Sequence, residues 1–436
     1  MQAIRRMSLW KKAVVIFGLA IGGVLAYSLV YNYPIRFRSK WSTASDLIAA
    51  IHPSGEKPDN IVIIPASDMS TSITIRWRTS DAVDDGVVRF AIMNDEKGEF
   101  QEVAAVMTKL HSVELKSDKT VHCYSAMLSG LMPGATYFYR VGSEVRGIWS
   151  EGGTFSTAPA SPESFSFIYI GDTQKSPERV GKMLADAEKK HPETAFYMIG
   201  GDLVDVGDLR NLWDDLLASL GEIFAKKPVA AAMGNHDFGD DDFGATIYNA
   251  YFSPFSERPE KPDEVPNYSF RYGDVHFIVV NSLDVSGQTK WLEKELQAAE
   301  KAGSTFTIVM FHLPVYNVKK NRSNRSAQKK WVPLFDKYKV DLVLTGHDHS
   351  YMRSKPLKSG REAKSGEFGT TYIVATGCDK FYPFQTLDIA ERQYADVATY
   401  QLITVQSGDG KEPKLFYTAY GSHGDVLDRF EKTSGK

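Results

Sequence analysis

The stretch Gly234-Asn235-His236-Asp237 decides how this chain is interpreted, because it places an amide, an imidazole and a carboxylate directly after the apolar run Val229–Met233. Four other strings also place such side chains after apolar runs: Gly171-Asp172-Thr173-Gln174, Gly201-Asp202-Leu203-Val204-Asp205, Phe311-His312-Leu313-Pro314 and Gly346-His347-Asp348-His349. The runs ahead of them have the length and composition of strands buried on both faces: Phe165–Ile170, Phe196–Ile199, Thr305–Phe311 and Val340–Leu344. Because ligands at the carboxyl ends of strands in an α/β sheet converge on one crevice, the five strings together predict a single site.

The polar side chains of these strings form a set of hard ligands. Carboxylates, an amide oxygen and imidazoles suit Mn, Fe, Zn or Mg rather than a thiolate-bound structural zinc. One carboxylate shared by two cations would hold them roughly 3.5–4 Å apart, and a water between them would lose a proton near neutral pH. The same cations would neutralise charge on a phosphoryl group, so phosphate ester hydrolysis is the predicted reaction.

Residues 57–159 show a different pattern from the rest of the chain. Ile73, Ile75 and Trp77 alternate with polar residues, and turn clusters separate about seven such runs, which predicts a β-sandwich. The segment 131–137 resembles the corner of a fibronectin type III domain, in which a Tyr side chain bonds back to the main chain. From about Ser164 onward strands alternate with helical patterns, so an α/β domain over residues 163–430 is expected to follow the all-β domain.

The order and spacing of the five strings resemble those of the calcineurin-like metallophosphoesterase superfamily. The sandwich ahead of them resembles the amino-terminal domain of the purple acid phosphatases, and the likeness covers about residues 57–430. Tyr338-Lys339-Val340-Asp341 and Tyr351-Met352-Arg353, on either side of the last string, agree with it. The resemblance implies a catalytic domain built as a sandwich of two mixed sheets flanked by helices.

The resemblance also implies a role for the residues of the strings. Asp202 would bridge two metal ions. The other ligands would divide between two sites, with Asp172 and His349 at the first and Asn235, His312 and His347 at the second. His236 would contact the phosphate and stabilise or protonate the leaving group, and Asp205 would orient His236.

Two positions depart from the family pattern. Gln174 stands where many members have His, and Asp205 stands where purple acid phosphatases have Tyr. Gln174 can supply its carbonyl oxygen as a ligand, but an amide is a weaker donor than an imidazole. We therefore expect a labile first metal and no tyrosinate-to-iron colour, and a mononuclear or inactive site is the alternative.

Two groups of side chains near the strings have two possible roles each. Asp237 and Asp348 either hold imidazoles in one tautomer or serve as caps and turn residues. The basic run after His312 either meets an anionic substrate or forms a solvated loop, and it consists of Lys319, Lys320, Arg322 and Arg325.

The composition is that of a globular protein of two or three domains, with 436 residues and a formal net charge of -3. That charge implies no attraction to nucleic acid, and we expect none to bind. The two cysteines, Cys123 and Cys378, are either one bridge between domains or two buried free thiols.

The amino end carries a location signal. Four basic residues precede Ala13–Val30, an uncharged stretch that would span roughly 27 Å as a helix. We expect a cytoplasmic basic segment over residues 1–12, a retained membrane anchor over 13–31 and a linker over 32–56. A signal peptide cleaved near Val24-Leu25-Ala26 is the alternative. Both place the catalytic domain outside the cytoplasm, in a periplasm or outside the cell.

The sequence thus predicts an exported, metal-dependent phosphoesterase that hydrolyses small phosphate monoesters by attack of a metal-bridging hydroxide. A phosphodiesterase with the same metal site is one alternative. Another is a cell-surface binding protein, in which the sandwich carries recognition and the metal site is catalytically silent. In a third, the sandwich covers the catalytic site of a neighbouring subunit, although the sequence leaves the oligomeric state open.

Overall fold

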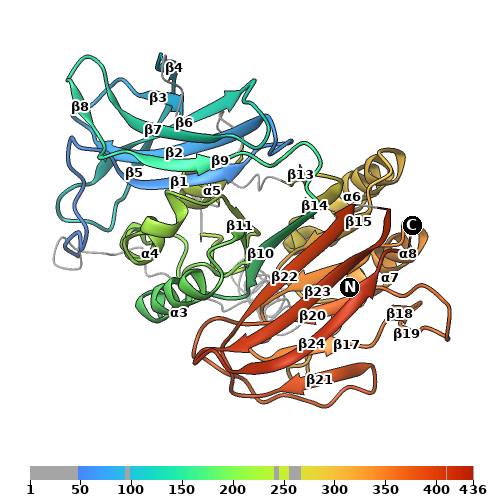
Figure 1. Ribbon diagram of the computed structural model, residues 1–436. Coiled ribbons are helices and arrows are strands. Elements are labelled where there is room, and N and C mark those ends of the chain that lie inside the picture. Colours follow the sequence, from blue (N-terminus) through green and yellow to red (C-terminus); the bar gives the residue numbers. More distant parts are fainter. Residues whose placement is uncertain (1–47, 94–98, 240–244, 255–266, 409, 436) are drawn as a thin grey trace, which may run out of the picture. The chain divides into compact units, whose positions relative to one another are not determined.

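The computed structural model describes residues 48–93, 99–239, 245–254, 267–408 and 410–435 (Figure 1). The sandwich and the α/β domain both belong to the unit from Ala49 to Lys436. The predicted membrane anchor and most of the predicted linker lie outside the described residues. No helix in the described ranges is both long enough and apolar enough to cross a membrane.

The amino-terminal part of this unit is a β-sandwich, as the alternating pattern predicts. One antiparallel sheet has the strand order β1-β2-β6-β5, and its strands are β1 (Asp59–Pro65), β2 (Ser72–Ser80), β6 (Thr120–Ser129) and β5 (Val106–His111). The other has the order β4-β3-β7-β8 with β9 also paired to β7, and its strands are β4 (Gln101–Ala104), β3 (Val87–Ile92), β7 (Thr136–Ser143), β8 (Ile148–Trp149) and β9 (Gly153–Ser156). The main-chain N–H of Met132 donates to the Tyr137 hydroxyl at 2.8 Å, which confirms the predicted tyrosine corner.

The α/β domain contains two mixed sheets, which confirms the expected architecture. The first sheet has the order β12-β11-β10-β22-β23-β24, and its strands are β12 (Val229–Ala231), β11 (Thr194–Ile199), β10 (Ser164–Ile170), β22 (Thr399–Gly408), β23 (Lys411–Gly421) and β24 (Val426–Thr433). The second has the order β13-β14-β15-β16-β20-β17-β21, and its strands are β13 (Tyr268–Tyr272), β14 (Val275–Val279), β15 (Phe306–Met310), β16 (Leu342–Thr345), β20 (Thr371–Val374), β17 (Tyr351–Ser354) and β21 (Ala390–Tyr394). A short hairpin, β18 (Leu357–Lys358) and β19 (Arg361–Glu362), stands apart from both.

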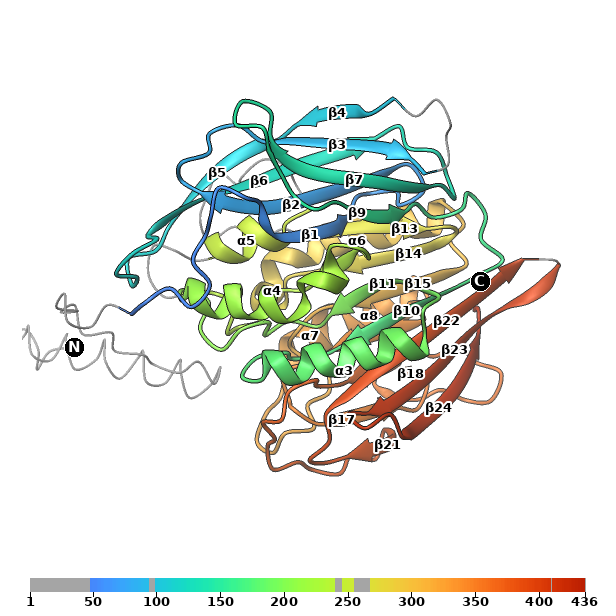
Figure 2. The same ribbon diagram turned by 60° about the vertical axis from the view of Figure 1, so that its left-hand side comes forward.

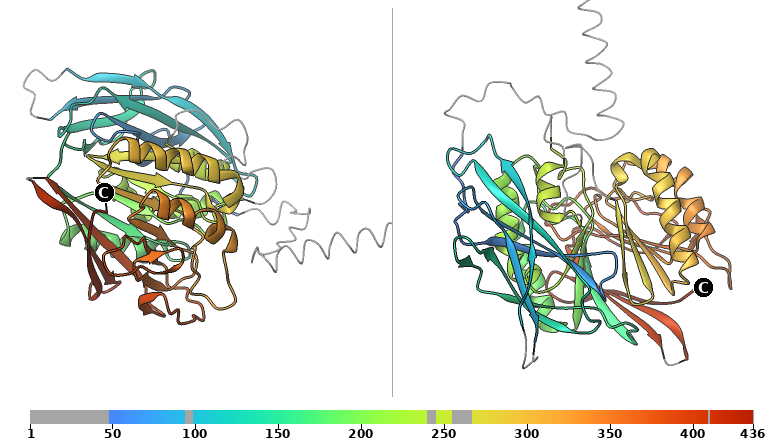
Figure 3. Two further views of the ribbon diagram at one scale, coloured as in Figure 1. Left: turned by 90° about the vertical axis from the view of Figure 1, so that its right-hand side faces the viewer. Right: turned by 90° about the horizontal axis from the view of Figure 1, so that it is seen from above.

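Helices flank both sheets (Figures 2 and 3). The first sheet packs against α3 (Pro177–Lys190) and α4 (Arg210–Phe224). The second packs against three helices that follow the 3-10 turn η3 (Ser282–Asp284): α6 (Val285–Lys301), α7 (Arg325–Lys330) and α8 (Val332–Lys337). The helical pattern around Trp331 is divided between α7 and α8, because proline near the start of α8 cannot continue the preceding helix.

The core between the two sheets is strongly aromatic. Phe167 and Phe196 from the first sheet stack at 5.1 Å, and Phe277 from the second meets them edge-on at 5.3 and 5.2 Å. This packing holds the two sheets face to face. The parallel strands β10, β11 and β12 of the first sheet and β15 and β16 of the second contribute side chains to the core between them. The arrangement fixes the strand ends from which the five strings emerge.

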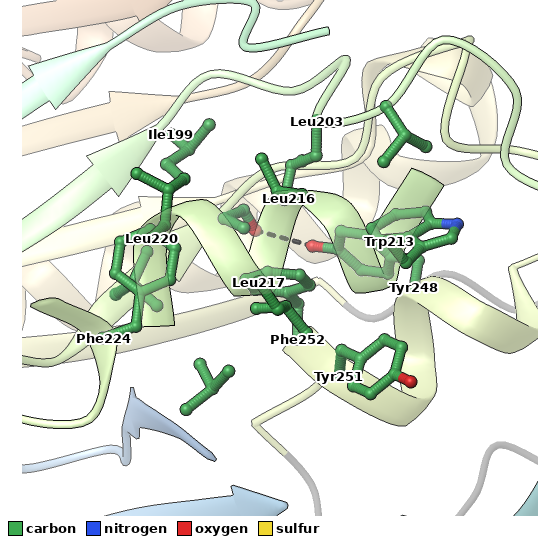
Figure 4. Close-up of a cluster of buried hydrophobic side chains, with 14 of the residues drawn as sticks. Ile199, Leu203, Trp213, Leu216, Leu217, Leu220, Phe224, Tyr248, Tyr251 and Phe252 are labelled. Carbon is green, nitrogen blue, oxygen red and sulfur yellow. Dashed lines mark hydrogen bonds between the residues drawn. The ribbon is translucent and has the colours of Figure 1, made fainter. Parts of the chain in front are cut away.

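A second core joins the sandwich to the α/β domain. The apolar stripe of α4 packs with α5 (Thr246–Phe252) around Trp213, and Val62 and Ile64 of β1 belong to the same cluster (Figure 4). Cys123 is also buried in this cluster. Both cysteines of the chain are buried free thiols, which is one of the two alternatives considered from the sequence.

Polar contacts reinforce the junction between the domains. The Arg76 guanidinium, on β2, donates to the carbonyl oxygens of Asn249, Ala250 and Ser253 at 2.7–3.0 Å. These carbonyls lie at the carboxyl end of α5, where a helix leaves acceptors without intrahelical partners and where its dipole favours a cation. The sandwich therefore supports the helix that follows the Gly234–Asp237 string in the chain.

Candidate metal centre

Two groups of potential metal ligands share Asp202. One group consists of Asp172, Asp202 and His349, and the other consists of Asp202, His312 and His347. Within each group, one ligand atom of each residue lies within 4.8 Å of the ligand atoms of the other two. Asp172 and Asp202 come from strand ends of the first sheet, and the histidines come from strings that follow strands of the second. The structure thus brings five of the predicted ligands together in two groups that share Asp202.

The histidine rings are held so that a defined nitrogen faces the carboxylates. The Nδ1 atoms of His312 and His349 lie 2.9 and 2.7 Å from the carbonyl oxygens of Gly200 and Lys380. Main-chain acceptors of this kind fix the tautomer and leave Nε2 for a cation. Accordingly, Nε2 of His312 lies 3.2 Å from the Asp202 carboxylate, and His347 presents Nδ1 at 3.1 Å from the same nitrogen.

The backbone at the site adopts conformations that are rare for residues other than glycine. Asp202, His347 and His349 have φ values of 50, 70 and 50°. Such left-handed residues persist only where surrounding structure holds them, and they concentrate at functional sites. The close packing around Asp202 also requires glycine at position 234, because a Cβ there would lie 2.1 Å from the main-chain nitrogen of Asp202.

The Asp237 carboxylate organises main chain rather than imidazole. It accepts hydrogen bonds from the N–H groups of Leu203, Val204 and Gly234 at 2.7–3.1 Å. It thereby ties the Asp202 string to the Asn235 string. Of the two roles considered from the sequence, the turn-stabilising role is the one the structure shows.

The amide side chains have the unsatisfied oxygens that a cation would need. Oδ1 of Asn235 and Oε1 of Gln174 are buried and accept no hydrogen bond from the described residues. Nε2 of Gln174 lies 3.2 Å from the Asp202 carboxylate and 3.0 Å from Nε2 of His349. Because the oxygen and nitrogen of an amide are exchanged by a half-turn, Gln174 can direct its oxygen at the first ligand group instead. The donor set, rich in oxygen and imidazole, fits two hard or borderline cations.

His236 is oriented mainly by main-chain groups, which refines the role predicted for Asp205. Its Nδ1 lies 2.7 Å from the carbonyl oxygen of Asp205, and its own N–H donates to the Asp202 carboxylate at 2.8 Å. The carboxylate of Asp205 is farther away, at 3.7 Å, and forms a salt bridge of 2.5 Å with Lys175. The sequence did not single out Lys175, because nothing in its local pattern indicates the partner.

Burial and mutual charges shift the pKa values of these groups strongly. Burial alone would raise the pKa of Asp202, but the charge and hydrogen bond of His312 outweigh burial and lower that pKa. Burial alone would lower the pKa of His312, but Asp202 raises it to about 9. Burial lowers the pKa of His349 to about 3 and that of His347 well below its usual value. The last two imidazoles are therefore neutral at pH 7, the form in which they bind metals.

A group of side chains near His349 comes from outside the five strings. The Tyr382 ring packs on the His349 ring at 4.6 Å between centroids, and Lys380 supplies the carbonyl that His349 contacts. The available sequence signal was the apolar run that forms β20 and continues to Ala375, with Thr376 and Gly377 directly after it. A sixth strand end near the site was therefore visible in the pattern, although its chemistry was not.

Comparisons with known proteins agree with this geometry. Residues 165–351 match the family model "Calcineurin-like phosphoesterase", and residues 58–157 match "Purple acid Phosphatase, N-terminal domain". The structure is similar to a purple acid phosphatase from yellow lupin seeds, with a TM-score of 0.72 and 19% identity over 87% of this chain and 74% of that chain.

Curated relatives point to the same family. An uncharacterised protein of Mycobacterium tuberculosis is 28% identical over an alignment that covers 66% of this chain. The same alignment covers 60% of the length of that protein. The Fe(3+)-Zn(2+) purple acid phosphatase 12 of Arabidopsis thaliana is 26% identical over 74% of this chain and 72% of its own length. Residues 165–351 therefore form a calcineurin-like phosphoesterase domain, and residues 58–157 ahead of it form a purple acid phosphatase N-terminal domain.

Proposed function

We propose that this protein is an exported phosphoric ester hydrolase that uses two metal ions to hydrolyse phosphate monoesters. The observation that carries the proposal is the sharing of Asp202 between two ligand groups, with His236 bonded to that same carboxylate through its main chain. A structural metal site would need neither the second group nor a partly exposed histidine beside it. Relatives named as purple acid phosphatases support the same reaction class.

The residues of the site would divide the work of hydrolysis among them. Metal ions bound there would acidify water and neutralise charge on the phosphoryl oxygens. Asp202 would keep the two ions at a fixed separation, and the neutral imidazoles of His347 and His349 would bind them without first losing a proton. His236 has Nδ1 engaged by the Asp205 carbonyl, so Nε2 would be the atom that donates a proton to the leaving oxygen.

The test is turnover of para-nitrophenyl phosphate and of bis(para-nitrophenyl) phosphate by the purified protein with added Mn, Zn or Fe. We expect metal-dependent hydrolysis of the monoester, loss of activity in Asp202→Asn, and a decrease of roughly 100-fold or more in His236→Ala. Asp388→Asn and His111→Ala change exposed residues of the same types and serve as matched controls. Faster turnover of the bis ester would replace monoesterase with diesterase, and no turnover with any metal would remove the proposal.

The export and anchoring of the protein are part of the same proposal. Support comes from the uncharged stretch Ala13–Val30 and from the basic residues ahead of it. We expect the full chain to stay with membranes after an alkaline wash, and its catalytic domain to be degraded by protease added to intact cells or spheroplasts. Recovery in the soluble cytoplasmic fraction would contradict both expectations, whereas release without the first 26 residues would indicate a cleaved signal.

A further inference from the structure

Three cationic side chains gather around one aromatic ring next to the first ligand group. Nζ of Lys319 lies 3.6 Å from the centroid of the Tyr382 ring, and Nζ of Lys380 and the guanidinium carbon of Arg322 each lie 5.2 Å from it. The cluster is in contact with the metal centre, because the Tyr382 ring packs on the His349 ring. All four side chains are partly buried.

The negative charge in the immediate surroundings does not balance these cations. The carboxylate of Asp348 pairs with Arg322 at 2.9 Å. Within the described part of the chain, neither Lys319 nor Lys380 has a carboxylate within 4.0 Å. Burial, then the charges of Arg322 and Lys380, lower the pKa of Lys319 to about 8, although Asp348 opposes the change. The cluster therefore holds like charges together at a cost that a bound anion would remove.

The cluster is held in place by the main chain rather than left to a mobile surface loop. Asp348, between the two histidines of its string, accepts hydrogen bonds from the N–H groups of Val318 and Lys319 at 2.7 and 3.1 Å. This loop is joined to the loop that carries Tyr382 in two places. Lys319 forms an isolated β-bridge with Phe384, and the N–H of Gln385 donates to the Val318 carbonyl at 2.7 Å. The solvated-loop reading of the basic run therefore fails for Lys319 and Arg322.

The cluster also adjoins the side of the centre where His236 would act. Asp379, the neighbour of Lys380 in the chain, accepts a hydrogen bond from the Ser176 hydroxyl, and Lys175, the neighbour of Ser176, forms a salt bridge with Asp205. Asp205 is the residue whose carbonyl orients His236. An anion held by Lys380 would thus belong to the leaving-group side of the substrate, whereas the phosphoryl group under attack would be held at the metal centre.

We propose that Lys319, Lys380 and Tyr382 form a subsite for a second anionic group, so that the preferred substrates are phosphate esters whose leaving group carries a phosphate or a carboxylate. The inference rests on the proposed phosphatase function and extends it to a substrate class. Water supplies the oxygen of the new P–O bond, and the P–O bond to the leaving group breaks. The leaving group departs with the bonding electron pair, gains one proton and keeps its anionic group in the subsite.

The test uses pairs of substrates that differ only in the second anion. 1,3-Propanediol bisphosphate is compared with 1,3-propanediol monophosphate for a phosphate, and 3-phosphoglycerate with glycerol 3-phosphate for a carboxylate. We expect kcat/KM of wild type to favour the anionic member of at least one pair by about 10-fold or more, the worth of one charge-assisted contact. The pair with the larger preference identifies the group.

Variants then assign that preference to the cluster. In the double variant Lys319→Gln/Lys380→Gln, we expect the ratio between the two members of a pair to fall to about 1. Lys320→Gln removes the same charge from an exposed neighbour and should keep the ratio, as should Lys319→Arg, which keeps the charge. A wild-type ratio near 1 in both pairs, or an unchanged ratio in the double variant, would overturn the subsite while the phosphatase function stood.

A binding measurement separates failure of the subsite from failure of the phosphatase proposal. If the metal-loaded wild type hydrolyses no ester, titration calorimetry with methylenediphosphonate and with methylphosphonate still compares two anions with one. Tighter binding of the diphosphonate that is lost in the double variant, but not in Lys320→Gln, would support the subsite alone. Equal affinities of wild type for the two phosphonates would overturn it.

Discussion

The guanidinium of Arg78, on strand β2, lies 2.6 Å from the carboxylate of Asp214, on helix α4, and both side chains are almost fully buried. This ion pair joins the sandwich to the phosphoesterase domain. Asp214 also accepts from Arg210 at 3.1 Å, and each arginine has a further carboxylate partner, Asp59 or Asp118. Asp214 is thus the anion that two buried cations share.

Loss of the Asp214 carboxylate should destabilise the whole unit. Asp214→Ala leaves Arg78 and Arg210 buried without their shared partner, and breaking a buried pair in this way costs about 3–5 kcal/mol. The free energy of unfolding, measured by urea denaturation with the midpoint and slope fitted together, checks the value. Asp215→Ala is the matched control, because its carboxylate pairs at 3.4 Å with His52 and both side chains are more than one-third exposed, at 34% and 38%, so the change should cost less than about 1 kcal/mol. Equal costs for the two variants would contradict the prediction.

Occupancy of the first metal should depend on the residue at position 174. Gln174→His replaces an amide with an imidazole beside His349 and Asp202 and should raise the affinity of the weaker metal by about 10-fold, whereas Gln174→Ala should lower it by a similar factor. Elemental analysis after dialysis against graded chelator measures the number of ions retained. Gln406→His, at an exposed position, controls for the added imidazole. Two tightly held ions in Gln174→Ala would show that the amide is not a ligand.

Replacement of Asp205 should have a smaller effect than replacement of His236. Asp205→Asn keeps the main-chain carbonyl that His236 contacts and removes only the carboxylate at 3.7 Å, so we expect about a 10-fold loss of kcat or less. If the residue positions a general acid, the loss should grow with the basicity of the leaving group across a series of substituted phenyl phosphates. A loss that is the same for every leaving group would reduce Asp205 to a structural role. Lys175→Met, which removes the salt-bridge partner of Asp205, should show the same trend more weakly.

Preference for substrates with a second anion should weaken in alkaline solution. The pKa of Lys319 is lowered to about 8 by burial and by the facing charges of Arg322 and Lys380, against the opposing charge of Asp348. Lys319 is therefore charged below pH 8 and loses its proton above it, so the ratio of kcat/KM within a matched substrate pair should fall as pH rises through about 8. The substrate of each pair that lacks the second anion serves as the internal reference, because its kcat/KM reports the titration of all other groups. In Lys319→Arg the ratio should persist to higher pH, because arginine keeps its charge.

Much of the fold and of the metal centre could be predicted because the signals are local. A buried strand is recognisable from a few consecutive apolar residues. The position of a ligand that directly follows such a strand is set by the position of the strand in the sheet. Asp172, Asp202 and His312 are brought together for this reason. The helix α4 could be predicted equally well, because apolar residues recur at helical spacing on the face that is buried against the domain core.

The remaining contacts depend on tertiary pairing that no short window contains. Tyr382 reaches His349 only because its loop is bridged to the loop of Lys319, and Lys175 meets Asp205 across thirty residues of chain. The sequence also could not distinguish the carbonyl of Asp205 from its carboxylate as the partner of His236, since that choice depends on the backbone path between them. Residue type was predictable at the site, whereas the atom that acts was not.

The contact between Arg76 and the end of α5 has a consequence for synthesis of the protein. The Asn249 carbonyl lies 173 residues beyond Arg76 in the chain. At the usual speed of a ribosome, roughly 9–35 s pass between translation of the two residues. During that interval the contacts of the guanidinium with α5 cannot form, so this face of the sandwich matures together with the domain translated after it.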